Sequence, residues 1–266
     1  MNVTSGDAML FVEEQGSGPP LVLLHPFPTN HKFWRPVLPA LAQRYRVLLP
    51  DLRGSGESSA GDGAATMRKH ADDLARVCDS AGIQRAAFAG ISIGGYILLE
   101  FWRRHAARVA ALVLGDTRAT PDTPEGRAAR LRSVTEVEQH GPATFVAGMT
   151  PKLLGETTRN HRPDVARAAI ALMNESSVAG IAALQQGMAE RPDSVPTLKT
   201  INVPTLVLVG EEDTLTPVSD AEQLRAGIAG SKLVKVPAAG HFTAFEQPEF
   251  VGRELRSFLD ALPSWA

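Results

Sequence analysis

Gly90-Ile91-Ser92-Ile93-Gly94 is the stretch that decides the fold of this 266-residue chain. The apolar run at 86–89 precedes it and is typical of a buried strand, and the residues after it repeat apolar side chains at helical spacing. Glycines two positions before and after Ser92 leave room for a turn too tight for side chains. Such a turn exposes the serine hydroxyl beside a helix N-terminus, where a developing negative charge is stabilised.

Strand and helix patterns alternate on both sides of this turn. The apolar runs Leu21–Leu24, Arg46–Leu49 and Ala110–Leu114 predict strands that are buried on both faces. Between them, Thr66–Ala81 places its apolar side chains on one stripe and is followed by Gly82, as in a capped amphipathic helix. The alternation predicts an α/β fold with a doubly wound, mostly parallel sheet.

The alternation stops over residues 118–197, where only helical patterns and breakers occur. It resumes with the strand pattern of Val203–Val209. We therefore expect a core made of residues 1–117 and 198–266, with a helical cap or lid at 118–197 inserted after the sixth strand. The helices expected in this lid are Thr123–Gln139, Ala143–Leu154, Pro163–Ser176 and Val178–Glu190.

Two polar residues follow the last two predicted strands. Asp213 comes just after Val203–Val209, and His241 comes after Lys232–Val236. Ligands of open α/β sheets sit outside the carboxyl ends of the strands, so these side chains and Ser92 are expected at one edge. A serine needs a base to become a nucleophile, an imidazole takes protons near neutral pH, and a carboxylate orients the imidazole. The three residues therefore predict nucleophilic catalysis.

The turn sequence, and the chain order serine, aspartate, histidine, resemble the α/β-hydrolase family, whose G-x-S-x-G motif is called the nucleophile elbow. The resemblance covers the whole chain, although the lid matches in position rather than in motif. It implies that Ser92, Asp213 and His241 are the catalytic triad. Asp116 also follows a predicted strand, and it stays open as an alternative acid.

The same resemblance places an oxyanion hole at two backbone N–H groups. One belongs to Ile93, the first residue of the helix, and the other to Phe27, in the turn after His25. Pro26 stands where the family usually has glycine, and proline has no N–H. The donor lies one residue later, so the predicted hole survives the change.

The other histidines are given less specific roles. His25 is interpreted as a brace for the predicted oxyanion turn, with a role as the base kept as an alternative. Surface or capping roles are expected for His31, His70, His105, His140 and His161. The chain has no His-Glu-x-x-His or Cys-x-x-Cys motif, so neither a metal site nor a cofactor is expected.

The resemblance implies a serine hydrolase that cleaves carboxylic esters or lactones through an acyl-enzyme on Ser92. The elbow carries aspartate in haloalkane dehalogenases and epoxide hydrolases and cysteine in dienelactone hydrolases, so a serine argues against these activities. The outline is similar to 3-oxoadipate enol-lactonases and small bacterial esterases. A perhydrolase with the same triad, and a small-molecule receptor that keeps the fold, are the alternatives.

Arginines are scattered through the predicted lid, and two roles stay open for them. They either form a solvated helix surface or bind a substrate carboxylate, as an enol-lactone would require. They are Arg118, Arg127, Arg130, Arg132, Arg159, Arg162 and Arg167.

Composition limits the expected partners. The net charge of −2 gives no reason to expect nucleic acid or an anionic membrane. Cys78 is the single cysteine, so no intramolecular disulfide forms. No stretch reaches the roughly 18 apolar residues of a membrane span, and residues 1–7 lack a signal-peptide pattern. We expect a cytoplasmic protein whose partner is a small ester or lactone; the oligomeric state stays unassigned.

Overall fold

An eight-stranded sheet forms the centre of the protein, as described by a computed structural model of residues 1–262. The strand order is β1-β2-β4-β3-β5-β6-β7-β8. Only the β1–β2 and β2–β4 pairs are antiparallel, which confirms the predicted α/β class with a mostly parallel sheet. The strands are β1 (Asn2–Ser5), β2 (Ala8–Gln15), β3 (Pro20–Leu24), β4 (Arg46–Pro50), β5 (Ala86–Ile91), β6 (Val109–Gly115), β7 (Thr205–Gly210) and β8 (Lys232–Val236).

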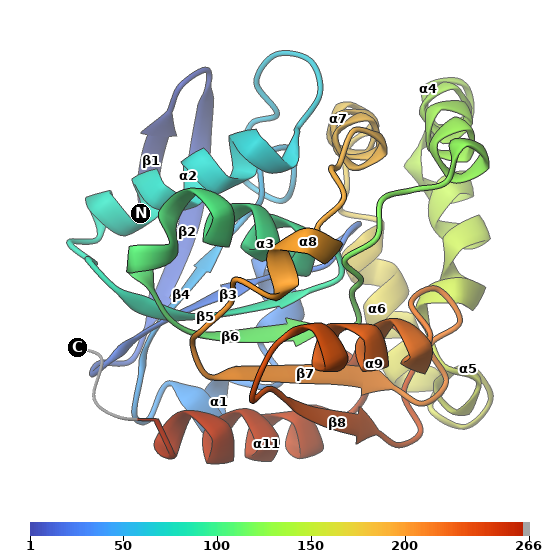
Figure 1. Ribbon diagram of the computed structural model, residues 1–266. Helices are drawn as coiled ribbons and strands as arrows, with labels where there is room; N and C mark the ends of the chain where they lie inside the picture. Colours follow the sequence, from blue (N-terminus) through green and yellow to red (C-terminus); the bar gives the residue numbers. More distant parts are fainter. Residues whose placement is uncertain (263–266) are drawn as a thin grey trace.

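Helices cover both faces of the sheet. In Figure 1, α2 and α3 lie above it, and α1 and α11 lie below it. The central strands β5, β6 and β7 are buried along their whole length, because helices exclude water from both faces. The core helices are η1 (His31–Trp34), α1 (Leu38–Leu41), α2 (Met67–Ser80), α3 (Ile93–His105), η2 (Ala106–Arg108), α8 (Val195–Leu198), α9 (Val218–Gly227), α10 (Thr243–Glu246) and α11 (Pro248–Asp260).

Between β6 and α8 the described chain forms four inserted helices, which stand beyond the carboxyl ends of the strands (Figure 1). Gly141 has non-helical dihedrals (φ 76°, ψ 171°) and kinks α4 near its middle, where the sequence predicts a break between two helices. No helix within residues 1–262 is both long and apolar enough to cross a membrane. The inserted helices are α4 (Pro124–Leu153), α5 (Glu156–His161), α6 (Pro163–Met173) and α7 (Val178–Ala189).

Glycines let α3 approach the sheet closely. A Cβ atom on Gly90 would lie 2.5 Å from the backbone carbonyl carbon of Gly94, the second residue of α3. A Cβ atom on Gly94 would lie 2.8 Å from the carbonyl oxygen of Leu24 at the end of β3. Both neighbours are backbone atoms that cannot rotate away, so any side chain here forces the helix off the sheet.

We expect Gly90→Ala to lower the free energy of unfolding by about 2 kcal/mol or more, because overpacking against backbone costs at least that order. Gly148→Ala is the matched control: it lies within α4, and its added Cβ would meet nothing within 4 Å. That variant should be as stable as the parent or slightly more stable. Urea unfolding measures both, and equal stability of the two variants would contradict the packing argument.

Candidate active site

Ser92 occupies the sharp turn between β5 and α3 that the sequence predicts. Its backbone has φ 56° and ψ −114°, a conformation that non-glycine residues rarely adopt. Two hydrogen bonds hold it there: the Ser92 N–H donates to Gly115 O (2.9 Å), and Thr117 Oγ1 donates to Ser92 O (2.8 Å). The end of β6 and the segment just after it thus fix the turn, and the strain is localised at the predicted nucleophile.

His241 and Asp213 lie together beyond the ends of β8 and β7. The His241 Nδ1–Asp213 Oδ2 distance is 2.8 Å, and both side chains are fully buried. Asp213 Oδ1 also accepts the backbone N–H groups of Leu215 (2.8 Å) and Thr216 (2.9 Å). Burial raises the pKa of Asp213, but attraction to His241 and the hydrogen bonds from His241 and Thr216 outweigh it and hold the pKa below its ordinary value. An ionised Asp213 therefore faces the imidazole.

Asp116, the alternative acid, faces other partners. Its Oδ1 accepts the Gly210 N–H (3.0 Å), and its Oδ2 accepts the hydroxyl of Thr243 (2.5 Å). Burial and the charge of Asp213 raise the pKa of Asp116 well above its ordinary value. The structure therefore brings Asp213, and not Asp116, into hydrogen-bond contact with His241, and Asp116 ties the end of β6 to β7 and to α10.

The second nitrogen of His241 is left unused. Among the described residues, Nε2 has no hydrogen-bond partner although it is buried, so no hydrogen bond joins it to Ser92 Oγ. A buried polar atom without a partner costs about 1–3 kcal/mol. Catalytic hydrogen bonds are often long in ligand-free enzymes and shorten when substrate is bound. Nε2 is thus available to form a hydrogen bond when a substrate is bound.

Phe27 and Ile93, the two residues of the predicted oxyanion hole, follow the ends of β3 and β5. Ile93 is the first residue of α3, so its N–H has no acceptor within the helix. Phe27 follows the end of β3, and its ring packs edge-on against Phe145 of α4 at 5.6 Å between centroids. Thr29 N–H closes the turn by donating to Pro26 O (3.1 Å), so proline is accommodated as an acceptor.

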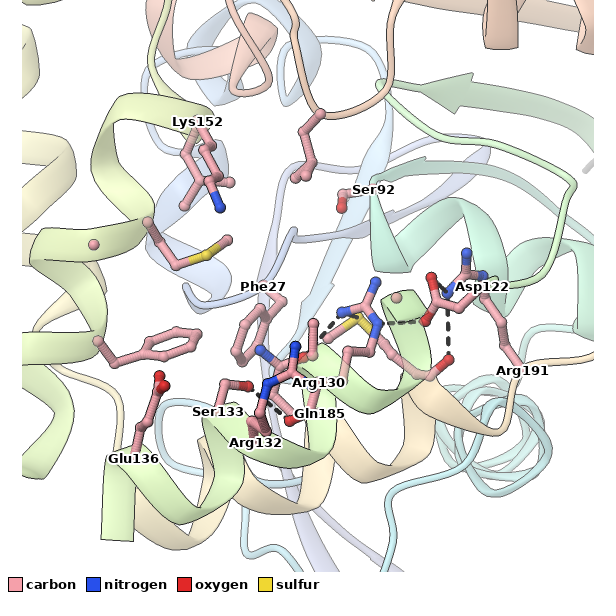
Figure 2. A pocket seen from close by; sticks show the side chains of 18 of the residues that line it. Phe27, Ser92, Asp122, Arg130, Arg132, Ser133, Glu136, Lys152, Gln185 and Arg191 are labelled. Carbon is pink, nitrogen blue, oxygen red and sulfur yellow. Dashed lines mark hydrogen bonds and ion pairs between the residues drawn. The ribbon is translucent and has the colours of Figure 1, made fainter. Parts of the chain in front are cut away.

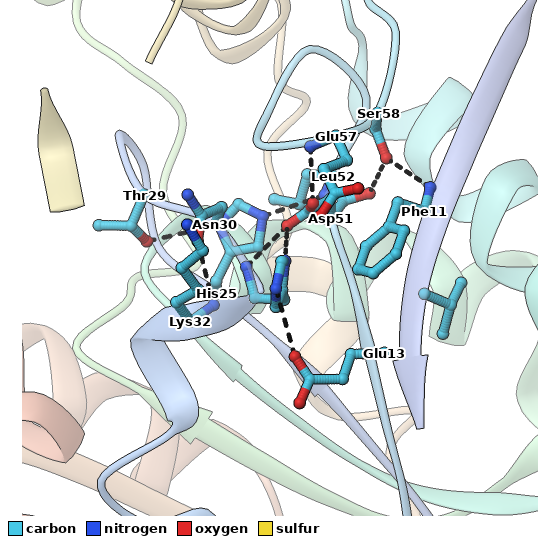
Figure 3. A network of polar contacts seen from close by, with 12 residues as sticks. Phe11, Glu13, His25, Thr29, Asn30, Lys32, Asp51, Leu52, Glu57 and Ser58 are labelled. Atoms are coloured by element: carbon cyan, nitrogen blue, oxygen red, sulfur yellow. Dashed lines mark hydrogen bonds and ion pairs between the residues drawn. The ribbon is translucent and has the colours of Figure 1, made fainter. Parts of the chain in front are cut away.

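His25 braces this turn from inside. Its Nε2 accepts the Leu52 N–H (3.0 Å), and its Nδ1 lies 3.0 Å from Pro26 O (Figure 3). Burial lowers the pKa of His25, so the ring is neutral and carries its proton on Nδ1, toward the Pro26 carbonyl. Both nitrogens are thereby engaged with backbone groups. The arrangement agrees with the bracing role and leaves His25 no free nitrogen to act as a base.

His31 and His70 contradict the expectation of surface or capping roles. His31 is buried, with Nδ1 at 2.9 Å from Asp51 Oδ1 and Nε2 at 3.2 Å from Glu13 Oε2. The prediction fails because the two carboxylates come from β2 and the end of β4, which only the sheet brings beside η1. His70 is also buried, on the sheet side of α2, and burial lowers its pKa to about 3.

A cavity of about 510 Å³ opens in front of Ser92, between the core and the inserted helices. Figure 2 shows Ser92 on one wall and side chains of α4 on the facing wall. Apolar residues from both parts line it, among them Phe27, Phe145, Met149 and Met188. A cavity of this size fits a small organic ligand.

Glu246 joins the histidine loop to the inserted segment. This buried carboxylate accepts the N–H groups of Gly155 and Gly240 (both 2.9 Å) and of Phe242 (3.2 Å). The N–H of His241 itself donates to Leu153 O, at the end of α4 (3.1 Å). Glu246 and the end of α4 therefore both hold the backbone of the loop that carries the imidazole. No residue pattern marks Glu246 for this task, and sequence reasoning missed it.

No group of three or more histidine, cysteine, aspartate or glutamate side chains within residues 1–262 is arranged to hold a metal ion.

Thr216 is another residue that the sequence does not single out. Its hydroxyl donates to Asp213 Oδ2 (2.5 Å) and lies 3.0 Å from His241 Nδ1, so it steadies the contact between acid and imidazole.

Comparison with known proteins places this geometry in a family. Residues 19–248 match the model of the alpha/beta hydrolase fold. The chain is 28% identical to 3-oxoadipate enol-lactonase 1 of Acinetobacter baylyi, over 88% of this chain and 85% of that protein. A thermophilic esterase from Thermogutta terrifontis, solved with malate bound, superimposes with a TM-score of 0.94 at 38% identity, covering 98% of this chain and 97% of that one. The enol-lactonase from Burkholderia xenovorans LB400 gives 0.91 at 25%, covering 98% and 100%. The chain belongs to the alpha/beta hydrolase family.

Proposed function

We propose that the protein hydrolyses carboxylic esters or lactones with Ser92 as nucleophile, His241 as general base and acid, and Asp213 as the carboxylate that orients the imidazole. The esterase and enol-lactonase among its relatives favour this substrate class. The unused Nε2 of His241 is the observation that carries the mechanism: the nitrogen opposite the Asp213 contact is buried and has no partner in the described structure.

In this mechanism Ser92 Oγ attacks the carbonyl carbon while His241 Nε2 takes its proton. The carbonyl oxygen becomes an anion, and the N–H groups of Phe27 and Ile93 stabilise it. Collapse of the tetrahedral intermediate breaks the bond to the alcohol oxygen, which leaves with the proton from His241. A water molecule, deprotonated by His241, then attacks the acyl-enzyme, and the acid is released from Ser92 with the proton returned to its oxygen.

An active-site label tests the nucleophile directly. We expect an alkyl fluorophosphonate to add its phosphonyl group once, on the tryptic peptide Ala86–Arg103, and mass spectrometry locates it. The labelled protein should lose its turnover of aryl esters of increasing acyl length and of simple lactones. Labelling on another peptide would remove Ser92 from the proposed role. Turnover that stops after one equivalent would instead indicate a receptor that keeps the fold.

A further inference from the structure

Positive side chains outnumber negative ones around the cavity that Ser92 lines. The lining includes five cations: Arg118, Arg130, Arg132, Lys152 and Arg191. Two carboxylates face them, those of Asp122 and Glu136. The chain as a whole carries a net charge of −2, so this excess is local and does not follow from composition.

Part of the positive charge is neutralised by partners on the same elements or next to them. Arg118 pairs with Asp220 of α9, with Nε 3.1 Å from Oδ2. Arg132 and Glu136 stand four residues apart on α4, the spacing at which helix side chains attract one another. Arg118 is therefore paired with a carboxylate, and the formal charges of Arg132 and Glu136 cancel.

The remaining excess of positive charge lies at two places in the cavity lining. Arg130 and Arg191 share the single carboxylate of Asp122, at 2.5 Å and 2.7 Å, so that cluster keeps one positive charge. The pKa of Asp122 is raised by burial but lowered more by the two arginines, so the acid stays ionised. Lys152 forms no ion pair with any described residue. Figure 2 shows its amine and the Arg130 guanidinium directed into the space that Ser92 faces.

Arg191 is not the member of the cluster that meets a ligand. Its side chain is 3% exposed, it donates to the carbonyl oxygens of Met188 and Thr120, and it stacks over the Tyr96 ring at 4.6 Å. Its role is to hold α7 and the β6–α4 connection together.

The Arg130 guanidinium is fixed in an orientation that leaves it able to bind a ligand. Asp122 fixes its Nε, and Gln185 of α7 fixes its Nη1 at 2.9 Å. None of the described residues accepts a hydrogen bond from Nη2, which leaves two N–H donors for the cavity. A guanidinium whose orientation is already fixed loses little entropy when it binds a planar carboxylate.

We propose that Arg130, assisted by Lys152, binds an ionised carboxylate that the substrate carries away from its scissile ester bond. The proposal rests on the proposed function and narrows it: the preferred substrates are half-esters of dicarboxylic acids, or lactones with a carboxylate side chain. Charge-assisted hydrogen bonds to a carboxylate are about twice as strong as neutral ones, so a substrate without the second acid loses this attraction.

A matched pair of esters tests the proposal. Monoethyl adipate ends in a carboxylate, and ethyl 6-methylheptanoate has the same chain ending in an isopropyl group of similar shape. We expect kcat/KM to favour the half-ester in the parent protein. Arg130→Gln should lower the ratio of the two kcat/KM values at least tenfold, Lys152→Gln should lower it less, and Arg130→Lys should restore part of it. Arg127→Gln is the control, since Arg127 lies on α4 outside the cavity lining and should leave the ratio unchanged.

Two further measurements keep the outcome decisive. Raising NaCl from about 20 to about 500 mM should lower kcat/KM for the half-ester alone, which tests the charge even if Arg130→Gln does not fold. Calorimetry on Ser92→Ala should show adipate binding more tightly than hexane-1,6-diol, and this result does not depend on turnover. If the protein hydrolysed neither ester, the proposed function would be overturned. If the ratio stayed unchanged in a folded Arg130→Gln variant, or if adipate bound no more tightly than the diol, the carboxylate site would be overturned.

Discussion

Replacing Ser92 by alanine is expected to lower kcat for ester hydrolysis by at least about a thousandfold, because no other group then supplies the oxygen that forms the acyl-enzyme. The change removes one buried hydroxyl, and the backbone hydrogen bonds to Gly115 and Thr117 that fix the turn remain. The free energy of unfolding should therefore change little. Steady-state kinetics with a short-chain aryl ester, together with urea unfolding, measures both quantities.

Ser80→Ala is the matched control for this variant. Ser80 is an exposed serine at the end of α2, distant from the cavity lining, and its loss should leave kcat and KM as they are. Ester turnover by Ser92→Ala at the parent rate would show that another residue is the nucleophile, and the acyl-enzyme proposal would be lost with it.

Asp213→Asn is expected to lower kcat by about 10³- to 10⁴-fold, because an amide neither stabilises an imidazolium nor fixes the correct tautomer. In the proposed mechanism the ionised Asp213, whose Oδ2 lies 2.8 Å from His241 Nδ1, is the group that makes the histidine an effective base. The loss should appear in kcat more than in KM, since Asp213 touches the imidazole and not the cavity.

Asp116→Asn provides the comparison that separates the two possible acids. Burial and the charge of Asp213 raise the pKa of Asp116 and so favour its neutral form, which an amide of the same shape imitates. We expect less than about a tenfold loss of kcat. A larger loss for Asp116→Asn than for Asp213→Asn would exchange the roles of the two carboxyl groups.

The sequence predicts the parts of the site that depend on local chain geometry. Glycines on both sides of Ser92 require a tight strand-to-helix turn, and the structure has that turn, with the Cβ atom of a replaced Gly90 overlapping α3. The ends of β7 and β8 meet because neighbouring parallel strands end at one edge, which places Asp213 beside His241. Both inferences need only the alternation of strands and helices.

Features that depend on packing between distant segments could not be predicted from the sequence. The helical spacing from Phe33 to Leu41 continues across two prolines, but the chain forms η1 and a separate short α1. Pro36 lies between the two helices, and Pro39 lies in the first turn of α1. Gln185 of α7 meets Arg130 of α4 across 55 positions of sequence. No local pattern distinguishes Arg130 from the solvated arginines of the same segment; only the packing of two helices does.

The attachment of Glu246 to Gly155 and Gly240 has a consequence for protein engineering. Exchanging the inserted helices between relatives changes specificity only if the graft leaves His241, the proposed general base, undisturbed. A junction downstream of Leu153 would cut through the bonds that orient the imidazole, so the donor segment would have to bring its own histidine loop. A junction upstream, at the Gly141 kink, keeps those bonds within the host protein. It exchanges only the first part of α4, which carries Arg130.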